Sequence, residues 1–340
     1  MSNHERTPLG VTYASLMTLG LDAALDTARL AERLGFGSFW TAETVGPEAF
    51  SVLAAAGSVA PDLDLGTGVL ALQLRTPALV AMAGATLQAL HPDREIVLGI
   101  GISSPVVTQR WHGAPYGERP LARVREYVTL LRQCLSGESV SFSGDFYEVS
   151  RFRLGVRLGD RRPRIVVGAL NPGMLRLAGE VADGVLLNYL PASHVAWSVG
   201  HVERGIADRA PELGPRPTIH AYVHAAAAAR EHGIDHARRD LFSYVVVDAY
   251  AANFERAGYG DEVNEIRARH AEGDREGALA AVSDRMVDGI DFMGEPDQVH
   301  QLVQDYRDAG VDAPVLMPLP WGPDRMAVVE ATMRAAAGLG

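Results

Sequence analysis

The sequence has no lysine, a single cysteine and no long uninterrupted apolar run. All 31 basic residues among its 340 are arginine, which excludes Schiff-base chemistry, pyridoxal phosphate and the lysine of a phosphate-binding P-loop together. The only cysteine, Cys134, cannot form an internal disulfide and fits a reducing compartment. Because it continues an apolar helical stripe, we expect a buried thiol rather than a nucleophile.

The sequence also has fewer basic residues than acidic ones. The 31 basic residues face 42 acidic ones, for a net charge of −11, and no basic cluster is dense enough for a phosphate backbone. Nucleic acid and anionic membranes are therefore not expected as partners. The N-terminal stretch MSNHERTPLG has no apolar signal core. We expect a cytoplasmic globular protein with a small-molecule substrate.

Strand-like and helix-like segments alternate along nearly the whole chain. The helical patterns cover residues 21–34, 50–59, 77–90, 120–135, 172–181 and a last segment from about Asp324. The strands are continuous apolar runs, as expected for a parallel sheet buried on both faces, and they cover residues 10–14, 37–43, 63–71, 95–101, 164–170, 184–190, 218–226 and 313–320. Eight such units predict an α/β fold, a (β/α)8 TIM barrel.

Two segments interrupt this alternation. Residues 136–163 alternate polar and apolar side chains like a β-hairpin, and residues 230–291 are charged and helical, with two or three short helices over 254–282. Both are too regularly patterned for linkers. We therefore predict one domain, residues 1–340, with a hairpin insertion and a C-terminal helical insertion.

Glycines near the fourth strand raise the question of a ligand. In EIVLGIGISSP, residues 95–105, Gly99 and Gly101 resemble the start of a dinucleotide-binding fingerprint. The third glycine is missing, and the next helix begins about 15 residues later instead of at once. The segment is therefore not a Rossmann fingerprint.

Other strands also carry glycines, among them Gly66, Gly68, Gly168 and Gly184. Glycine weakens a strand unless another group must approach its backbone. Bare backbone at the carboxyl ends of barrel strands would suit a flat or phosphorylated ligand. Tight packing inside the barrel would explain the same glycines equally well, and the residues alone leave both explanations open.

Four segments in order along the chain carry a family resemblance: ARLAERLGFGSFWTAE, LDLGTGVLALQLRTPALVAMAGATLQAL, VLGIGISSPVVTQRWHG and LNPGMLRLAGEVADGVLLN. Together with GEPDQVHQLVQDYRDAGVDAPVLMP, they resemble the bacterial luciferase-like flavin and deazaflavin oxidoreductases. The resemblance covers nearly the whole chain. It implies a luciferase-like TIM barrel with both insertions, usually a homodimer, that binds FMN or coenzyme F420 at the barrel mouth.

Residues 101–128 and 245–263 are most similar to the F420-dependent branch of that family. This similarity implies a non-prolyl cis peptide, at Gly68-Val69, in a bulge behind the deazaflavin ring. It also implies cofactor contacts after the fourth and fifth strands. Without lysine, the phosphate would be held by backbone N–H groups, serine hydroxyls and helix N-termini. The predicted cofactor-binding residues are Gly68, Val69, Gly101, Ile102, Ser103, Ser104, Gly168, Ala169, Leu170, Asn171 and Gly184.

Glu43, at the end of the second strand, matches the position of a family acid near the ring. It could hydrogen-bond the deazaflavin or donate a proton, and an ordinary carboxylate paired with an arginine is the alternative. Alcohol-oxidising relatives have an acid–histidine pair here and another acid after strand four, where this chain has Glu43-Thr44 and Ser104. This departure disfavours sugar-phosphate oxidation and favours reduction of a C=C or C=N bond.

Further candidates are Trp111, as a pocket wall, and His112, as a proton donor, both in the loop after strand four. Tyr13 and Asn188 are weaker candidates, with packing at the barrel mouth as the alternative. Four histidines have metal-compatible spacing but no HExxH motif, so we predict no metal site and expect strand-end and surface histidines; they are His220, His224, His232 and His236.

The resulting prediction is an F420-dependent oxidoreductase that transfers a hydride to or from a small organic substrate. One alternative is an FMN-dependent monooxygenase on the same barrel, which would need oxygen and a partner flavin reductase. Another is a non-catalytic barrel, which the retained glycines and Glu43 disfavour.

Overall fold

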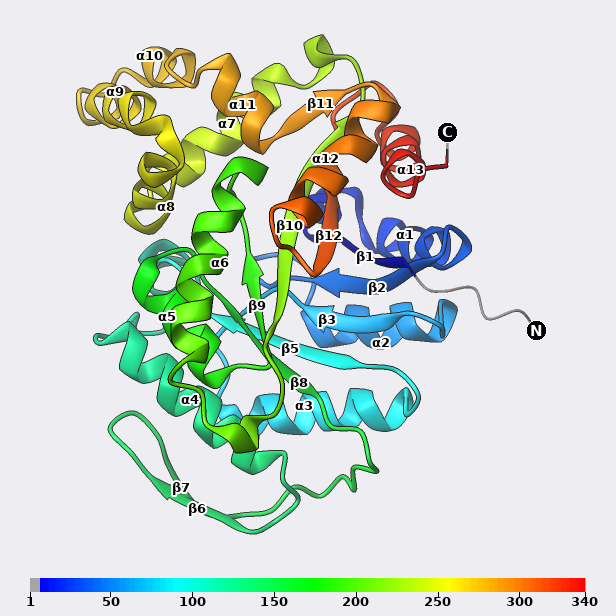
Figure 1. The fold of residues 1–340 in the computed structure, drawn as a ribbon, viewed down its shortest axis with the longest axis vertical. Coiled ribbons are helices and arrows are strands. Elements are labelled where there is room, and N and C mark those ends of the chain that lie inside the picture. The colour runs from blue at the N-terminus through cyan, green and yellow to red at the C-terminus, as the bar shows by residue number, and fades with distance from the viewer. Residues whose placement is uncertain (1–6, 340) are drawn as a thin grey trace.

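The structure is a computed structural model that describes residues 7–339. Within this range eight parallel strands close into a barrel, in the order β1-β2-β3-β5-β8-β9-β10-β12, and β12 pairs with β1 again. Figure 1 shows them at the centre of the molecule with helices around them. The predicted TIM barrel is confirmed. The strands are β1 Thr7–Thr12, β2 Phe36–Thr41, β3 Asp64–Thr67, β5 Ile96–Gly101, β8 Arg164–Gly168, β9 Gly184–Leu187, β10 Thr218–Ala227 and β12 Ala313–Pro318.

The barrel strands bury both of their faces, which explains their continuous apolar sequences. In β5, Val97 belongs to a buried cluster inside the barrel with Trp40 and Tyr222, whereas Leu98 packs with the surrounding helices. Successive side chains of a strand point to opposite faces. Neither face meets water, so no polar alternation appears in the sequence.

The surrounding helices begin and end close to the predicted positions. Thr76 caps α3 through Leu79 N–H, and Cys134 is buried in α4, where burial raises its thiol pKa to about 11. Two helices, α6 and α12, are not among the predicted helical patterns. The helices are α1 Leu21–Arg33, α2 Ala49–Val59, α3 Pro77–Leu90, α4 Pro120–Cys134, α5 Pro172–Val181, α6 Ala192–Ile206, α12 Pro296–Asp308 and α13 Arg325–Ala336, with the short helices η1 Ala14–Leu19, η2 Val106–Trp111 and η3 Pro211–Leu213.

The predicted third strand, residues 63–71, is divided in two. β3 ends at Thr67, and a two-residue strand, β4 (Leu70–Ala71), pairs with β5 further along. The Gly68-Val69 peptide bond between them is cis. The expected non-prolyl cis peptide is therefore present, and the prediction of one continuous strand was wrong.

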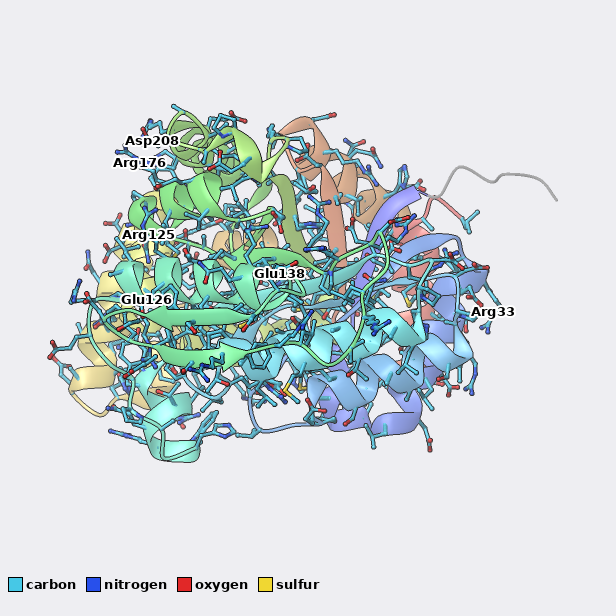
Figure 2. All side chains as sticks on the ribbon, turned by 90° about the horizontal axis from the view of Figure 1, so that it is seen from below. Arg33, Arg125, Glu126, Glu138, Arg176 and Asp208 are labelled. Atoms are coloured by element: carbon cyan, nitrogen blue, oxygen red, sulfur yellow. The ribbon has the colours of Figure 1, made fainter. Side chains whose placement is uncertain are left out.

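The hairpin insertion is confirmed as β6 (Val140–Ser143) paired antiparallel with β7 (Glu148–Phe152). Its turn is tied to α4, because the carboxylate of Glu126 accepts hydrogen bonds from the backbone N–H groups of Asp145, Phe146 and Tyr147 at 2.7–2.9 Å. Glu126 is labelled in Figure 2 on the face where this hairpin crosses the helices. Figure 1 shows the hairpin at the opposite edge of the molecule from the helical insertion.

The helical insertion contains η4 Arg230–His232, α7 Ile234–Val245, α8 Asp248–Phe254, η5 Glu255–Tyr259, α9 Gly260–Ala271, α10 Arg275–Ala280 and α11 Asp284–Ile290, and β11 (Phe292–Gly294) then pairs with β10. Its helices share a buried cluster with the barrel interior, in which Leu241 and Met286 pack with Leu186 and Val315. This shared cluster supports the interpretation of one domain, which stays a prediction. In residues 7–339 no helix has the length and apolarity needed to cross a membrane.

Candidate active site

A cavity of about 390 Å³ opens at the carboxyl ends of the barrel strands, the end at which barrel enzymes place their active sites. Residues from η1, β4, β5, β10, β12 and the helical insertion surround it, together with residues that directly follow β2, β3, β5, β9 and β12. The lining comprises Ala14, Ser15, Met17, Ala42, Glu43, Thr44, Gly68, Val69, Ala71, Gly101, Ile102, Ser103, Asn188, Tyr189, Tyr222, Asp240, Tyr244, Tyr250, Met317, Leu319, Pro320 and Trp321.

The side chain of Val69 fills a space that glycines on neighbouring strands leave free. A Cβ atom on Gly99, Gly101 or Gly168 would lie 3.3, 2.9 or 3.3 Å from a methyl carbon of Val69. These distances are too short for an unstrained methyl contact. Tight packing therefore accounts for all three glycines. Gly101 also borders the cavity, and a ligand against its backbone stays a prediction.

Tyr222 holds this part of the cavity from the far side of the barrel. Its hydroxyl donates a 2.7 Å hydrogen bond to the carbonyl oxygen of Gly68. β10, which carries Tyr222, lies four strands from β3 in either direction around the barrel. The bond therefore crosses the barrel interior, where both groups are shielded from water.

Five of the predicted cofactor-binding residues line the cavity: Gly68, Val69, Gly101, Ile102 and Ser103. The structure thus brings together two segments that are more than 30 residues apart in the sequence. Their contact with a cofactor stays a prediction.

The other predicted cofactor-binding residues lie beside the cavity or away from it. The hydroxyl of Ser104 accepts a hydrogen bond from Val107 N–H in η2, and Asn171 precedes α5 and accepts a hydrogen bond from Arg256. Gly168, Ala169 and Leu170 connect β8 to that helix and are not among the lining residues.

Gly184 does not reach the mouth of the barrel. It begins β9, so it lies at the amino end of the strand, opposite the cavity. A Cβ atom there would lie 2.9 Å from Val166 and 3.0 Å from the carbonyl oxygen of Thr218. Close packing accounts for this glycine, and its position argues against the predicted cofactor contact.

Glu43 lines the cavity, and its carboxylate is held by an arginine. Arg75 donates two hydrogen bonds to it, at 2.6 and 2.9 Å, and Ala49 N–H donates a third at 3.2 Å. Such a bidentate pair fixes the orientation of the carboxylate. The arginine partner is the alternative that the sequence left open, and a catalytic role for Glu43 stays a prediction.

Trp111 and His112 lie near the mouth but outside the cavity lining. Trp111 is 56% exposed, and the ring of His112 lies 2.5 Å from the carbonyl oxygen of Thr44 through Nε2. This bond connects the loop after β5 to the loop after β2. The predicted roles in a pocket wall and in proton donation remain untested. Tyr13 is 1% exposed and donates to Gly20 O, as a packing residue would.

The expectation of strand-end or surface histidines was wrong for two of the four. His220 and His224 are 8% and 2% exposed within β10, because successive residues of a barrel strand are all buried. His220 packs against Trp40 with their ring centroids 5.1 Å apart. Within residues 7–339, no group of three or more histidine, cysteine or acidic side chains could hold a metal ion.

His224 belongs to a polar cluster that the sequence analysis missed. Its Nδ1 lies 2.9 Å from Asp291 Oδ1, and its Nε2 lies 2.8 Å from Asn188 Oδ1. Tyr189 donates a 2.8 Å hydrogen bond to Asp240 Oδ2. Of these five residues, Asn188, Tyr189 and Asp240 line the cavity. Asn188 was a weak candidate from the sequence, and the structure places it here.

A barrel enzyme typically has its cavity at the carboxyl ends of the strands, with titratable side chains in its lining. This closed (β/α)8 barrel has that architecture. The family model described as luciferase-like monooxygenase matches residues 5–313. The chain therefore belongs to the luciferase-like family.

Relatives and solved structures agree with this assignment. The chain is 29% identical over 308 residues to a 5,10-methylenetetrahydromethanopterin reductase of Archaeoglobus fulgidus, covering 89% of this chain and 91% of that one. It is 31% identical over 304 residues to a putative coenzyme F420-dependent oxidoreductase of Mycobacterium tuberculosis, covering 83% and 86%. The fold matches the F420-dependent tetrahydromethanopterin reductase of Methanopyrus kandleri, with a TM-score of 0.79, 22% identity and coverage of 96% and 97%.

Proposed function

We propose that the protein is a coenzyme F420-dependent oxidoreductase that reduces a C=C or C=N bond of a small organic substrate. The observation that carries this proposal is the cavity at the barrel mouth, with bare backbone on one wall and titratable side chains on the other. A relative named as a putative coenzyme F420-dependent oxidoreductase aligns over 83% of the chain, and two named as F420-dependent glucose-6-phosphate dehydrogenases align over 51% of it, which supports this cofactor over FMN.

The residues present fit a flat ring with an anionic tail. A Cβ atom at Gly68 would lie 2.0 Å from the hydroxyl of Tyr222, so only bare backbone fits at this part of the wall. Gly68-Val69 and Gly101–Ser103 would contact the ring, and the α5 N-terminus at Asn171 would accept negative charge. F420, when bound, supplies or accepts a hydride as a two-electron carrier.

The protein's own contribution is to orient the substrate against the cofactor and to supply a proton. Glu43 is fixed by Arg75 on one side of the cavity, so it can orient a hydrogen-bond donor there. The aromatic side chains of Tyr244, Tyr250 and Trp321 form an apolar surface that favours a planar, conjugated substrate.

Titration of the purified protein with F420 and, separately, with FMN tests the cofactor. We expect F420 to bind, with a change in its fluorescence, and FMN to bind far more weakly. Binding of FMN without F420 would favour the monooxygenase alternative, and binding of neither would favour a non-catalytic barrel. Size-exclusion chromatography with light scattering tests the predicted homodimer.

A matched pair of variants locates the binding site. Ser103→Tyr places a ring in the cavity, whereas Ser58→Tyr places the same ring on the exposed face of α2. We expect the first variant to bind F420 at least about tenfold more weakly, a change of about 1.4 kcal/mol, and the second to bind as the parent does. Equal affinities would place the cofactor elsewhere.

A further inference from the structure

The cavity wall formed by β9, β10 and the helical insertion carries a buried proton-sharing cluster. Asp240, on α7, and Tyr189 border the cavity. Behind them lie Asp291 and His224, which are 0% and 2% exposed. The four side chains come from segments that are far apart in the sequence. Hydrogen bonds join Tyr189 to Asp240 and Asp291 to His224, and the two carboxyl groups lie in contact with each other.

The hydrogen bonds of Asn188 define the tautomer of His224. Asn188 Oδ1 accepts a 2.9 Å hydrogen bond from Tyr189 N–H, and His224 Nε2 lies 2.8 Å from the same oxygen. An amide oxygen only accepts, so Nε2 carries the hydrogen. Burial lowers the pKa of His224 to about 4, so the ring is neutral and its Nδ1 is an acceptor. Burial also raises the pKa of Asp291, so we assign the proton between Asp291 Oδ1 and Nδ1, which lie 2.9 Å apart, to the carboxyl rather than to the ring.

The second oxygen of Asp291 requires another proton. Among residues 7–339, Asp291 Oδ2 is buried and no N–H or hydroxyl donor reaches it. The carboxyl of Asp240 is in hydrogen-bonding contact with Asp291, and two carboxyl groups can share such a contact only through a proton. Since Asp291 gives its own proton to His224, the shared proton belongs to Asp240.

The surroundings keep these protons in place. Burial raises the pKa of Asp240 to about 7 and that of Asp291 to about 8. The groups that face Asp240 are Asp291, His224 and the hydroxyls of Tyr189, Tyr244 and Tyr250. None of the ion pairs formed by the described arginines includes either carboxyl. The carboxylate forms therefore have no arginine partner, and the basic group beside them is the His224 ring, whose pKa burial lowers.

We propose that Asp240 is the proton donor of this active site, and that Asp291 and His224 are positioning residues that hold its proton. The inference rests on the proposed function, because it needs a hydride donor in the same cavity. Asp240 would give its proton to one atom of the substrate double bond, while the other atom would receive the hydride that reduced F420 supplies when bound. Asp240 becomes a carboxylate that accepts a hydrogen bond from Tyr189, and water in the open cavity returns the proton.

Infrared spectroscopy tests the proton inventory without any substrate. A protonated carboxyl has a carbonyl stretch that is separate from the carboxylate bands and shifts in D2O. We expect the parent protein to show this band at pH 6 and to lose it as the pH rises past 8, with a smaller band in Asp240→Asn and in Asp291→Asn. Asp235→Asn, on the exposed face of the same helix, is the matched control and should leave the band unchanged. A parent spectrum without the band, or a band equal in all variants, would overturn the proposal.

Turnover tests the catalytic role, with reduced F420 as hydride donor and a cyclic enone and a cyclic imine as probes. We expect Asp240→Asn to lower kcat by about 100-fold or more, while its F420 affinity stays within about twofold. Asp240→Glu should recover part of the activity, and Asp291→Asn should move the alkaline limit of kcat to lower pH. Tyr189→Phe removes a hydrogen-bond donor to the Asp240 carboxylate, which should raise the pKa of Asp240. The alkaline limit of kcat should therefore move to higher pH.

The outcomes separate the two proposals. If F420 does not bind to the parent protein, or neither probe reacts, the proposed function fails and the infrared result still decides whether the cluster holds protons. If F420 binds equally to parent and Asp240→Asn and both reduce a probe at the same rate, only the assignment of Asp240 as proton donor fails.

Discussion

The two walls of the cavity differ in the groups that they present, since one exposes backbone and the other carries polar side chains. On the side of β3 and β5, Gly68 and Gly101 present backbone, and the largest side chains are the aliphatic ones of Val69 and Ile102. On the side of β9 and the helical insertion, Tyr189 and Asp240 carry hydroxyl and carboxyl groups into the cavity. One wall is shaped by missing side chains and the other by side chains that exchange protons. Under the proposed function, the first wall would contact the cofactor and the second would supply the proton of the product.

A methyl group at Gly99 tests how tightly the first wall is packed. Its Cβ atom would lie 1.9 Å from the carbonyl oxygen of Thr67, a backbone group that cannot turn away. We expect Gly99→Ala to lower the free energy of unfolding by about 3 kcal/mol, measured by urea denaturation. Gly200→Ala is the matched control, since no atom lies within 4 Å of its Cβ position in α6. It should stabilise the protein by about 0.5–1 kcal/mol, and equal midpoints would contradict the packing argument.

Glu43 lies in the loop after β2, between the two walls of the cavity. Its replacement tests whether its carboxylate acts on the substrate. We expect Glu43→Gln to lower turnover by about 100-fold if the carboxylate acts on the substrate, with F420 binding nearly unchanged. Glu48→Gln is the control, because Glu48 also pairs with Arg75 but is 43% exposed. Unaltered turnover in Glu43→Gln would leave Glu43 as a partner of Arg75 only.

The hydrogen bond from Tyr222 to Gly68 joins the two walls of the cavity. Its loss should therefore lower both the stability of the protein and its affinity for the cofactor. We expect Tyr222→Phe to destabilise the protein by about 1–2 kcal/mol, because the carbonyl of Gly68 stays buried without its donor. Tyr306→Phe removes a similar bond to Leu190 O, away from the cavity. Both variants should lower the midpoint of urea unfolding, but only Tyr222→Phe should weaken F420 binding. Equal affinities would separate this bond from the cofactor site.

The second wall should also give stability a pH dependence that the first cannot give. The pKa values of Asp240 and Asp291 are raised in the folded state, so the folded protein binds more protons than the unfolded chain above pH 4. Their stabilising contribution is complete at low pH and is lost as the pH rises through about 7 to 8. Between about pH 5 and pH 8 the thermal midpoint should fall, with little further change above about pH 8.5, and Asp291→Asn should flatten this fall. An equal slope in the variant would contradict the assignment.

The smallest effects are expected in the loop after β5. Trp111 is 56% exposed and His112 is also exposed, so Trp111→Ala and His112→Ala should each change the free energy of unfolding by less than about 0.5 kcal/mol. Because neither side chain lines the cavity, we also expect turnover to change by less than about tenfold. A larger loss in either variant would support the roles predicted for it from the sequence.

Much of the fold could be predicted because both faces of each strand are buried. Runs such as residues 164–170 therefore read as continuous apolar segments, and the helices between them follow ordinary capping rules, as Thr76 does for α3. The break at Gly68-Val69 was expected only from the family resemblance. Helix α6 was missed, and its N-terminus has no side-chain cap at Pro191.

The site was less predictable than the fold. Gly101 ends β5 and Ser103 follows it. Their position at the carboxyl end of a predicted strand was enough to make them candidates for the site. The proton-sharing cluster has no such signal, because its members stand up to 103 positions apart, from Asn188 to Asp291, and meet only in three dimensions. One clue was available: His224, like His220, is a titratable residue inside a strand that is predicted to be buried, and a buried polar side chain needs partners.

The packing of Val69 restricts the order in which this barrel can accept substitutions during evolution. A methyl at Gly101 would meet only the Val69 side chain, and one at Gly168 would meet mainly the same side chain, whereas one at Gly99 would meet backbone. Shortening Val69 to alanine would thus make the first two substitutions acceptable and leave the third forbidden. The order of mutations matters here: a change on one strand must come before its neighbours are free to vary.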